Sequence, residues 1–277
     1  MALYTGNIKF TATDTEPTSD KGRIYYDDSD SQLKHYDGSD WINVNTNVNV
    51  DRPGDGQYTV DSYTKLLIHS DTFNNSTTFD DASDEDWGLD DNGGVKHSSA
   101  YSKIGDTSIA FDGVNDYLKI PATCDLLNWP SSGTIDFWVY PTDFRSGSTD
   151  YYMPPIVSKG DVYLNIGFNN SGNVVVYYYS GTTNSVVSSS TLSEDEWAHV
   201  AITWSSANGI VIYKNGTSIG SNANKTLGNM ESGADGRGVQ IGVTDVGSSS
   251  QTWFEGYVDE LRVSEGIRRW TSNFTVY

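Results

Sequence analysis

The chain has 277 residues, a formal net charge of −20 at pH 7 and a sequence pI near 4.3. A surface this acidic repels phosphate backbones, which argues against nucleic acid as a partner. Aromatic residues make up 13% of the chain, too many for a disordered sequence. The single cysteine excludes an intrachain disulfide. No apolar run reaches the roughly 18 residues of a membrane span, so we expect no membrane insertion.

The first ten residues, MALYTGNIKF, contain neither a basic stretch nor the apolar core of a secretory signal peptide. We therefore expect the protein to be made in a cytoplasm and not to be exported by that route.

Residues 1–60 differ in composition from the rest of the chain and predict a small β segment with a linker. Two short strands are predicted at residues 24–26 and 33–36, and the turn Asp37-Gly38, a hairpin signal, leads to residues 41–44. The following NVNTNVNVDRPGDGQ is rich in turn residues, as is typical of linkers. A segment this short buries little core by itself, so we expect it to anchor on other chains. The candidate anchoring residues are Tyr25, Tyr26, Tyr36 and Trp41.

Residues 61–277 form a second predicted domain, built from short strands of alternating polarity that are separated by turn residues. The predicted strands cover residues 66–71, 108–113, 116–120, 134–140, 162–168, 174–180, 197–204, 210–216, 239–243 and 257–264. Alternation in the strand at 197–204 predicts a core face made of Ala198, Val200, Ile202 and Trp204. The pattern predicts an all-β sandwich or jelly roll without helices.

Seven segments of this second domain resemble, in family order, the laminin-G-like members of the concanavalin A-like lectin/glucanase family. They are SIAFDGVNDYLKI, TIDFWVYPT, IVSKG, WAHVAITW, IVIYKNGTSIG, VQIGV and FEGYVDELRVSEGIRRWTSNFT. The resemblance implies a concanavalin A-like (laminin-G-like) jelly-roll sandwich, to which the small N-terminal β anchoring segment is added. Residues 78–92 and 144–155 depart from the family pattern, so the resemblance implies nothing about their structure.

Two motifs are similar to sequences of bacteriophage structural proteins. GRIYYDDSDSQLKHYDGSDWINV resembles a motif of phage fibre and head-decoration proteins, and GYVDELRVSEGIRRWTSNFT resembles endings of phage tail proteins. These resemblances imply a virion-surface protein that is synthesised in the host cytoplasm. The expected partners are other virion proteins bound through the N-terminal segment, sister chains in a homo-oligomer (a trimer is favoured), and host-surface polysaccharide.

No catalytic residues are predicted. Glucan-cleaving members of the superfold carry a Glu-x-Asp-x-x-Glu strand, which this sequence lacks. The acidic run at residues 193–196 has the wrong spacing and is interpreted as a solvated turn. The Gly-x-Ser-x-Gly match at residues 216–220 continues a hairpin and lacks the helix that such a nucleophile needs. The four histidines have no metal-ligand spacing. We therefore expect a protein that is not an enzyme.

Calcium is the one cofactor that the family resemblance implies, as a structural ion. Asp259 occupies the matching position in the last strand, and Asp71 is the expected partner near the start of the domain. Backbone carbonyls and water would complete the six to eight oxygens that calcium needs. The alternative is that Asp259 caps a strand end or pairs with Arg262. The oxygen-rich Asp112, Asn115 and Asp116 are better explained as an Asx-Gly turn.

Sugar binding requires exposed aromatic rings flanked by polar groups. Strand alternation places Tyr177 and Tyr179 on the face opposite to Tyr178, where they could line a concave surface. Tyr151 and Tyr152 lie in a predicted loop, where binding residues concentrate. The alternative for each of these four rings is packing in the core or against a neighbouring subunit.

The sequence is best interpreted as a bacteriophage virion surface protein, either a capsid decoration protein or a fibre or tail adhesin, that displays a carbohydrate-binding sandwich. One alternative is an architectural decoration protein that stabilises the capsid without binding glycans. Another is a soluble carbohydrate-binding module.

Overall fold

The computed structural model describes residues 12–13, 24–27, 32–36, 41–43, 57–121, 124, 126–127, 131–146, 148, 153–160, 164–179, 183–223, 238–244 and 251–276. All regular secondary structure within these residues is β-strand, as predicted. No helix in this part of the chain is long and apolar enough to cross a membrane. The chain divides into two compact units, Met1–Pro53 and Gly54–Tyr277.

The first unit contains a four-stranded sheet with the order β1-β2-β3-β4. Its strands are β1 (Ala12–Thr13), β2 (Ile24–Asp27), β3 (Gln32–Tyr36) and β4 (Trp41–Asn43). Strands β2, β3 and β4 pair antiparallel in sequence order, and β1 pairs parallel to β2. All four predicted anchoring residues lie in these strands; Tyr36 pairs with Trp41. Tyr36 is half-buried, and the side-chain surroundings of Tyr25, Tyr26 and Trp41 lie outside the description.

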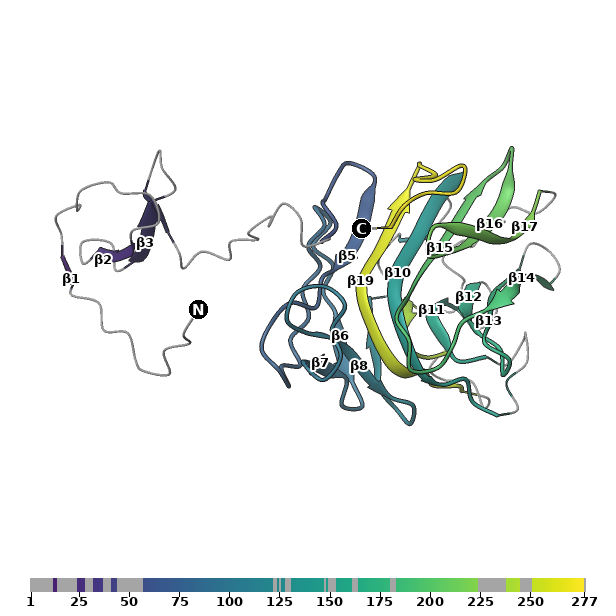
Figure 1. Cartoon of the computed structure of the whole chain (residues 1–277), viewed down its shortest axis with the longest axis horizontal. Coiled ribbons are helices and arrows are strands. Elements are labelled where there is room, and N and C mark those ends of the chain that lie inside the picture. Colours follow the sequence, from purple (N-terminus) through teal and green to yellow (C-terminus); the bar gives the residue numbers. More distant parts are fainter. Residues whose placement is uncertain are drawn as a thin grey trace. The chain divides into compact units, whose positions relative to one another are not determined.

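The second unit consists of two sheets that face one another (Figure 1). The path of the eight-stranded sheet is β17-β16-β15-β10-β19-β8-β7, and β5 also pairs with β19. These strands are β5 (Thr64–Ile68), β7 (Lys96–Ser98), β8 (Ser108–Asp112), β10 (Ser132–Asp143), β15 (Ala198–Ser205), β16 (Gly209–Lys214), β17 (Thr217–Asn222) and β19 (Glu255–Glu265).

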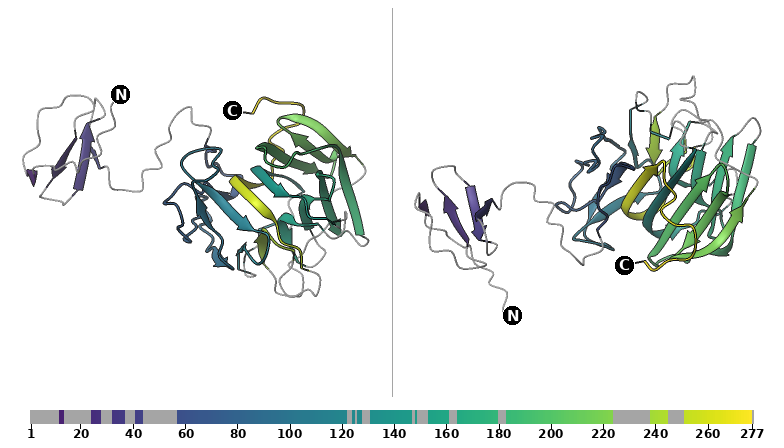
Figure 2. Two further views of the ribbon diagram at one scale, coloured as in Figure 1. Left: turned by 60° about the horizontal axis from the view of Figure 1, so that its bottom comes forward. Right: turned by 90° about the horizontal axis from the view of Figure 1, so that it is seen from above.

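The seven-stranded sheet has the order β14-β13-β12-β11-β18-β9-β6, and the two layers are visible from other directions in Figure 2. Its strands are β6 (Asp90–Asn92), β9 (Tyr117–Lys119), β11 (Pro155–Lys159), β12 (Leu164–Phe168), β13 (Asn173–Tyr179), β14 (Thr183–Thr191) and β18 (Val239–Ile241). All the strand pairings in the second unit are antiparallel. The predicted all-β sandwich is confirmed.

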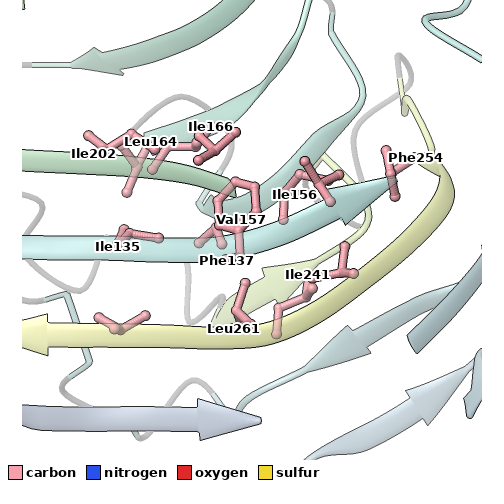
Figure 3. Close-up of a cluster of buried hydrophobic side chains, with 14 of the residues drawn as sticks. Ile135, Phe137, Ile156, Val157, Leu164, Ile166, Ile202, Ile241, Phe254 and Leu261 are labelled. Carbon is pink, nitrogen blue, oxygen red and sulfur yellow. The ribbon is translucent and has the colours of Figure 1, made fainter. Parts of the chain in front are cut away.

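One hydrophobic core fills the space between the two sheets. Figure 3 shows Ile135 and Phe137 of β10 facing Leu164 and Ile166 of β12. The predicted core face of β15 is confirmed, because Ala198, Val200, Ile202 and Trp204 all belong to this core. Gly133 is required opposite Trp204, because a Cβ atom there would lie 2.2 Å from the indole ring.

Asp81 organises the acidic section that departs from the family pattern. Its carboxylate is buried and accepts hydrogen bonds from the backbone N–H groups of Leu67 (2.9 Å), Ser83 (2.9 Å) and Trp87 (3.0 Å). The Ser83 hydroxyl donates a fourth bond to Asp81 at 2.8 Å. A carboxylate that accepts several N–H bonds can be buried without an ion pair. This section therefore folds around one carboxylate.

The outer face of the eight-stranded sheet carries a buried ion pair. Arg262 of β19 donates from Nε (3.1 Å) and Nη2 (2.9 Å) to the two carboxylate oxygens of Asp136 on β10. Burial raises the pKa of Asp136, but the Arg262 charge and the hydrogen bonds from His199 and Arg262 outweigh it, so the pKa lies below its usual value. The Tyr58 ring covers the Arg262 guanidinium at 4.0 Å. Removal of one partner of such a pair typically costs about 3–5 kcal/mol.

Tyr58 also explains where the second unit begins. Its hydroxyl lies 2.7 Å from His199 Nε2, and its backbone N–H donates to Glu260 at 2.8 Å. The sequence predicts a boundary at residue 60, whereas the second unit starts at Gly54. The reason is that residue 58 packs on the sandwich, so residues that the sequence assigns to the linker belong to the second unit.

The turn between β8 and β9 has the predicted Asx-Gly geometry. Asp112 Oδ1 accepts hydrogen bonds from the N–H groups of Val114 (2.8 Å) and Asn115 (3.3 Å), and Gly113 has φ of 73°. Asp116 Oδ2 accepts a bond from the Asp112 N–H at 3.0 Å, so it closes the turn. The Asp116 side chain is 4% exposed, and Oδ1 has no hydrogen-bond partner among the described residues. Burial, followed by the Asp112 charge, raises the pKa of Asp116 to about 6.

This pKa predicts a pH dependence of stability. Because the folded-state pKa of Asp116 lies above its ordinary 3.8, its contribution is present below about pH 4 and is lost as the pH rises through 6. Asp116→Asn keeps an oxygen for the Asp112 N–H and removes the charge. We expect the variant and the wild type to have equal free energies of unfolding at about pH 4. At about pH 7.5 the variant should be more stable by about 1 kcal/mol, less than the pKa shift implies because the amide also lacks a partner.

Urea unfolding followed by tryptophan fluorescence at the two pH values measures this difference. Asp112→Asn is the matched control, because it keeps the cap of the turn and removes the charge that raises the Asp116 pKa. That control should therefore show a weaker pH dependence than the wild type. An Asp116→Asn protein that is destabilised equally at both pH values would contradict the assignment.

Candidate functional site

Three carboxylates from distant parts of the sequence form a row on the outer face of the eight-stranded sheet. Glu255 of β19 pairs in register with Asp112 of β8 on one side and with Asp143 of β10 on the other. Side chains of paired residues in neighbouring strands lie next to one another on the same face. Like charges in this arrangement repel, so the row is suited to a ligand that offers hydrogen-bond donors.

These carboxylates line a pocket of about 140 Å³, here called the carboxylate pocket. Its walls are Asp112, Gly113, Val114, Asp143, Arg145, Trp253 and Glu255. Asp143 Oδ1 accepts a bond from the Arg145 N–H at 2.7 Å, and Glu255 Oε1 lies 3.4 Å from the Thr142 hydroxyl. Among the described residues, the hydrogen bonds of this row involve only one oxygen of each carboxylate: Oδ1 of Asp112, Oδ1 of Asp143 and Oε1 of Glu255. The second oxygen of each carboxylate can accept a hydrogen bond from a ligand.

Arg145 and Trp253 form the walls that are not acidic. Arg145 Nη1 donates to the backbone oxygens of Gly113 (3.2 Å) and Trp253 (3.3 Å), which connects the turn after β8 to the segment before β19. The Trp253 ring lies 5.8 Å from the ring of Tyr117, and both side chains are half-buried. The pocket thus has an aromatic wall beside its three acceptor groups.

Four aromatic rings continue the site along the same face, two residues further along β19. Tyr257 pairs in register with Tyr140 of β10, and the Trp197 ring lies 5.6 Å from that of Tyr140. Tyr101 stacks on Tyr140 at 4.6 Å and contacts Tyr257 at 5.0 Å. Tyr101 is 44% exposed, and Trp197 and Tyr257 are half-buried. These four residues are called the aromatic row.

The carboxylate pocket and the aromatic row together suit a ring-shaped ligand that is rich in hydroxyl groups. Carboxylates accept hydrogen bonds from hydroxyls, and aromatic rings pack against the apolar faces of sugar rings. Pockets that combine an apolar wall with a few polar groups are the usual form of small-molecule sites. The arrangement therefore supports a binding role.

Of the predicted calcium residues, Asp71 follows β5 and Asp259 lies within β19. Asp259 is buried; its Oδ2 accepts bonds from the N–H groups of Lys103 (2.9 Å) and Ile104 (3.0 Å), and its Oδ1 from Glu260 (2.9 Å). Burial raises the pKa of Asp259 well above its usual value, and the charges of Glu260 and Asp71 add to this. Asp259 therefore neither caps a strand end nor pairs with Arg262, whose partner is Asp136.

Asp71 is exposed and accepts bonds from the Gln57 amide and the Asp106 N–H, each at 2.6 Å. Within the described parts of the chain, no group of three or more His, Cys, Asp or Glu side chains is arranged to hold a metal ion. A calcium ion between Asp71 and Asp259 would have to share oxygens that already accept N–H bonds. Calcium at this pair stays a prediction.

The predicted sugar-contact tyrosines are placed only in part. Tyr177 lies on the outer face of β13, opposite to Tyr178 in the core, as alternation predicts. It is only 5% exposed and packs with Met153 and Val175, so it offers little ring surface to a ligand. Tyr179 ends β13, and its side chain is outside the description. Tyr151 and Tyr152 lie outside the described residues.

The sequence analysis did not identify the carboxylate pocket or the aromatic row. A signal was available in part, because Trp138 and Tyr140 occupy the outward positions of the strand whose inward positions are Ile135, Phe137 and Val139. Two aromatic rings on the outward positions of a strand suggest a covered or ligand-binding face. The carboxylate row had no such signal, because its three members lie on strands that are distant in the sequence and become neighbours only in the folded sheet.

Residues 112–271 match the family Laminin_G_3, described as the concanavalin A-like lectin/glucanases superfamily. No curated protein sequence matches the chain. The fold is similar to domain 4 of AbnA, a GH43 extracellular arabinanase from Geobacillus stearothermophilus, in complex with arabinotriose. That similarity has 18% identity and a TM-score of 0.53, and covers 74% of this chain and 94% of the AbnA domain.

Two toxin binding domains have a similar fold. The binding domain of Paraclostridial Mosquitocidal Protein 1 has 15% identity and a TM-score of 0.55, with 75% of this chain and 50% of that one covered. The binding domain of Botulinum Neurotoxin DC, in complex with SialylT, has 13% identity and a TM-score of 0.50, with 73% and 47% covered. The chain thus spans about half the length of these two toxin domains. Since the family match extends over more than half of its sequence, the chain belongs to the concanavalin A-like lectin/glucanases superfamily.

Proposed function

We propose that the protein is a carbohydrate-binding module that binds neutral saccharides at the carboxylate pocket and the aromatic row. The observation that carries this proposal is the row of Asp112, Glu255 and Asp143 in register, with Trp253 as a wall of the same pocket. Three acceptor groups beside an aromatic surface match the two sides of a sugar ring, its hydroxyls and its C–H face.

The comparisons support the proposal at the level of the family. The AbnA domain was solved with arabinotriose, and it is a separate domain of an arabinanase. A sandwich of this fold can therefore hold a saccharide. The negative charge of the pocket favours neutral sugars over uronic or sialic acids, because carboxylates on the ligand would face those of Asp112, Asp143 and Glu255.

We extend the proposal to the setting of the protein, a bacteriophage particle. The N-terminal sheet of β1–β4 would attach the chain to other virion proteins or to sister chains, with a trimer favoured. The sandwich would then adhere to host-surface polysaccharide without cleaving it. Several copies on one particle make weak single-site binding sufficient. The short β sheet in the first unit supports an anchoring role, since it belongs to a compact unit of its own.

Substitutions in the carboxylate pocket test the binding site. We expect Trp253→Ala and Glu255→Gln each to weaken saccharide binding by about tenfold or more, because they remove the aromatic wall and the central acceptor. A glycan array with arabinotriose added, followed by titration calorimetry on the saccharides that bind, measures this change. Phe73→Ala is the control, because Phe73 is 85% exposed and lies outside the site.

The same saccharides should be recovered intact after long incubation with the protein, and released reducing ends would identify an enzyme instead. An array without any bound glycan would favour the architectural alternative, in which the sandwich stabilises a capsid by contacts alone.

Deletion of residues 1–53 tests the anchoring role of the first unit. We expect the deletion to abolish incorporation into particles and to leave the sandwich folded, because the core lies within the second unit. Immunogold labelling of particles with antibody to the second unit measures incorporation, and circular dichroism measures folding. Gold on heads would indicate a decoration protein and gold at tail tips an adhesin. If no particle is labelled even with the full chain, a soluble carbohydrate-binding module becomes the better explanation.

We also propose that a structural calcium ion binds at Asp71 and Asp259, as the family resemblance implies. Asp259 and Glu260 are buried, and the Asp71 charge raises the pKa of both carboxyls, so a cation would relieve their repulsion. We expect calcium at millimolar concentration to raise the midpoint of thermal unfolding by several degrees, and Asp71→Asn to remove the effect. Magnesium is the control ion. Equal midpoints in calcium and in EDTA would exclude the site.

A further inference from the structure

A second cavity lies within the second unit, on the same outer face but away from the carboxylate pocket. It measures about 310 Å³ and is here called the tail cavity. Its walls are Gln57, Tyr58, Thr59, His199, Arg262, Trp270, Phe274, Thr275 and Val276. The lining comes from residues 57–59, from β15 and β19, and from residues 270 and 274–276. No residue of the carboxylate pocket or the aromatic row takes part in it.

Aromatic rings supply the apolar surface of the tail cavity. Trp270 and Phe274 are stacked, with ring centroids 4.0 Å apart and an interplanar angle of 10°. The His199 ring meets both at nearly right angles, at 5.7 Å from Trp270 and 5.8 Å from Phe274. Both Trp270 and Phe274 are half-buried and line the cavity, so part of each ring is accessible to a ligand.

The groups beneath the cavity contact one of the two nitrogens of the His199 ring. His199 Nε2 lies 2.7 Å from the Tyr58 hydroxyl and 3.7 Å from Oδ2 of Asp136, which is itself paired with Arg262. The other ring nitrogen, Nδ1, takes no part in these contacts.

His199 Nδ1 has no hydrogen-bond partner among the described residues, although the side chain is only 1% exposed. Buried polar atoms without a partner are rare in folded proteins, and each calls for an explanation such as a bound ligand. An apolar ligand group in the cavity would leave Nδ1 unpaired. A hydroxyl group can donate to this nitrogen or accept from it, so a hydroxyl on a ring with an apolar face satisfies both the nitrogen and the aromatic wall.

We propose that the tail cavity is a second saccharide site, which takes one neutral sugar ring of an oligosaccharide. A sugar hydroxyl forms a hydrogen bond with His199 Nδ1, and the C–H face of the ring packs against Trp270 and Phe274. This site does not depend on sugar binding at the carboxylate pocket, because the two sites share no residue. A module with two sites can cross-link neighbouring chains of one polysaccharide.

Fluorine NMR on the full chain labelled with 5-fluorotryptophan tests both sites at once. The eight tryptophans give separate reporters, of which Trp253 lines the carboxylate pocket and Trp270 the tail cavity. Trp253→Phe and Trp270→Phe assign the two resonances. The probes are arabinotriose, maltotriose and triacetylchitotriose. We expect at least one of them to shift the Trp270 resonance with saturation, in the wild type and in Trp253→Phe.

A matched pair of variants tests occupancy of the cavity. Thr275→Phe fills it and should weaken binding at Trp270 by tenfold or more, without affecting the Trp253 resonance. Thr271→Phe adds the same ring to the segment after β19, at an exposed position outside the cavity. This variant should leave binding at Trp270 and the Trp253 resonance unchanged. His199→Phe removes Nδ1 as a hydrogen-bond partner, and the Trp270 shift should disappear while circular dichroism shows a folded protein. If His199→Phe unfolds the chain, the two threonine variants decide the question.

The outcomes for the two sites are distinguishable. A shift at Trp253 without one at Trp270 overturns the second site and leaves the proposed function in place. A shift at Trp270 alone supports the second site and removes the carboxylate pocket as a sugar site. If none of the three probes shifts the resonance of Trp253 or of Trp270, both the proposed function and the second site are overturned. Equal binding in Thr275→Phe and the wild type also overturns the second site.

Discussion

The ion pair between Asp136 and Arg262 is the constraint around which the outer face of the sandwich is organised. It joins β10 and β19, the two longest strands of the second unit, at a point that is fully buried. A buried ion pair is tolerated only where further groups shield it and complete its hydrogen bonds. Tyr58 and the residues that follow β19 supply this cover, and they leave the carboxylate pocket and the aromatic row open at the other end.

Much of the sandwich could be predicted from the sequence, because alternating polar and apolar residues indicate which face of a strand lies in the core. The strand at 197–204 is such a case, since one set of its residues is the observed core face. Strand β14 was missed for a physical reason: it lies at the margin of the seven-stranded sheet and consists largely of Ser, Thr and Asn. Such strands form because their backbone groups pair with a neighbouring strand, and their side chains give little indication of this pairing in the sequence.

The candidate site could not be predicted in the same way, because its residues meet only through strand order. Asp112, Asp143 and Glu255 are far apart in the sequence, and each looks like an ordinary turn or strand-end residue. Their register across β8, β19 and β10 puts them in one row. Sequence reasoning instead selected Tyr177, which alternation placed on the correct face but which neighbouring side chains cover. The sequence of a strand predicts the face on which a side chain lies, but whether that side chain is exposed depends on the rest of the fold.

The place of β19 in the sheet determines when the sandwich can form during synthesis. It pairs with β5, β8 and β10, and it follows all of them in the sequence. Until residue 265 has left the ribosome, β8 and β10 have no strand between them, and the apolar sides of Leu261 and Val263 are absent from the core. The sheet therefore closes late, by contacts between residues that are far apart in the chain, which makes folding slow and dependent on a complete polypeptide. An interrupted chain would expose two unpaired strand edges to aggregation or proteolysis.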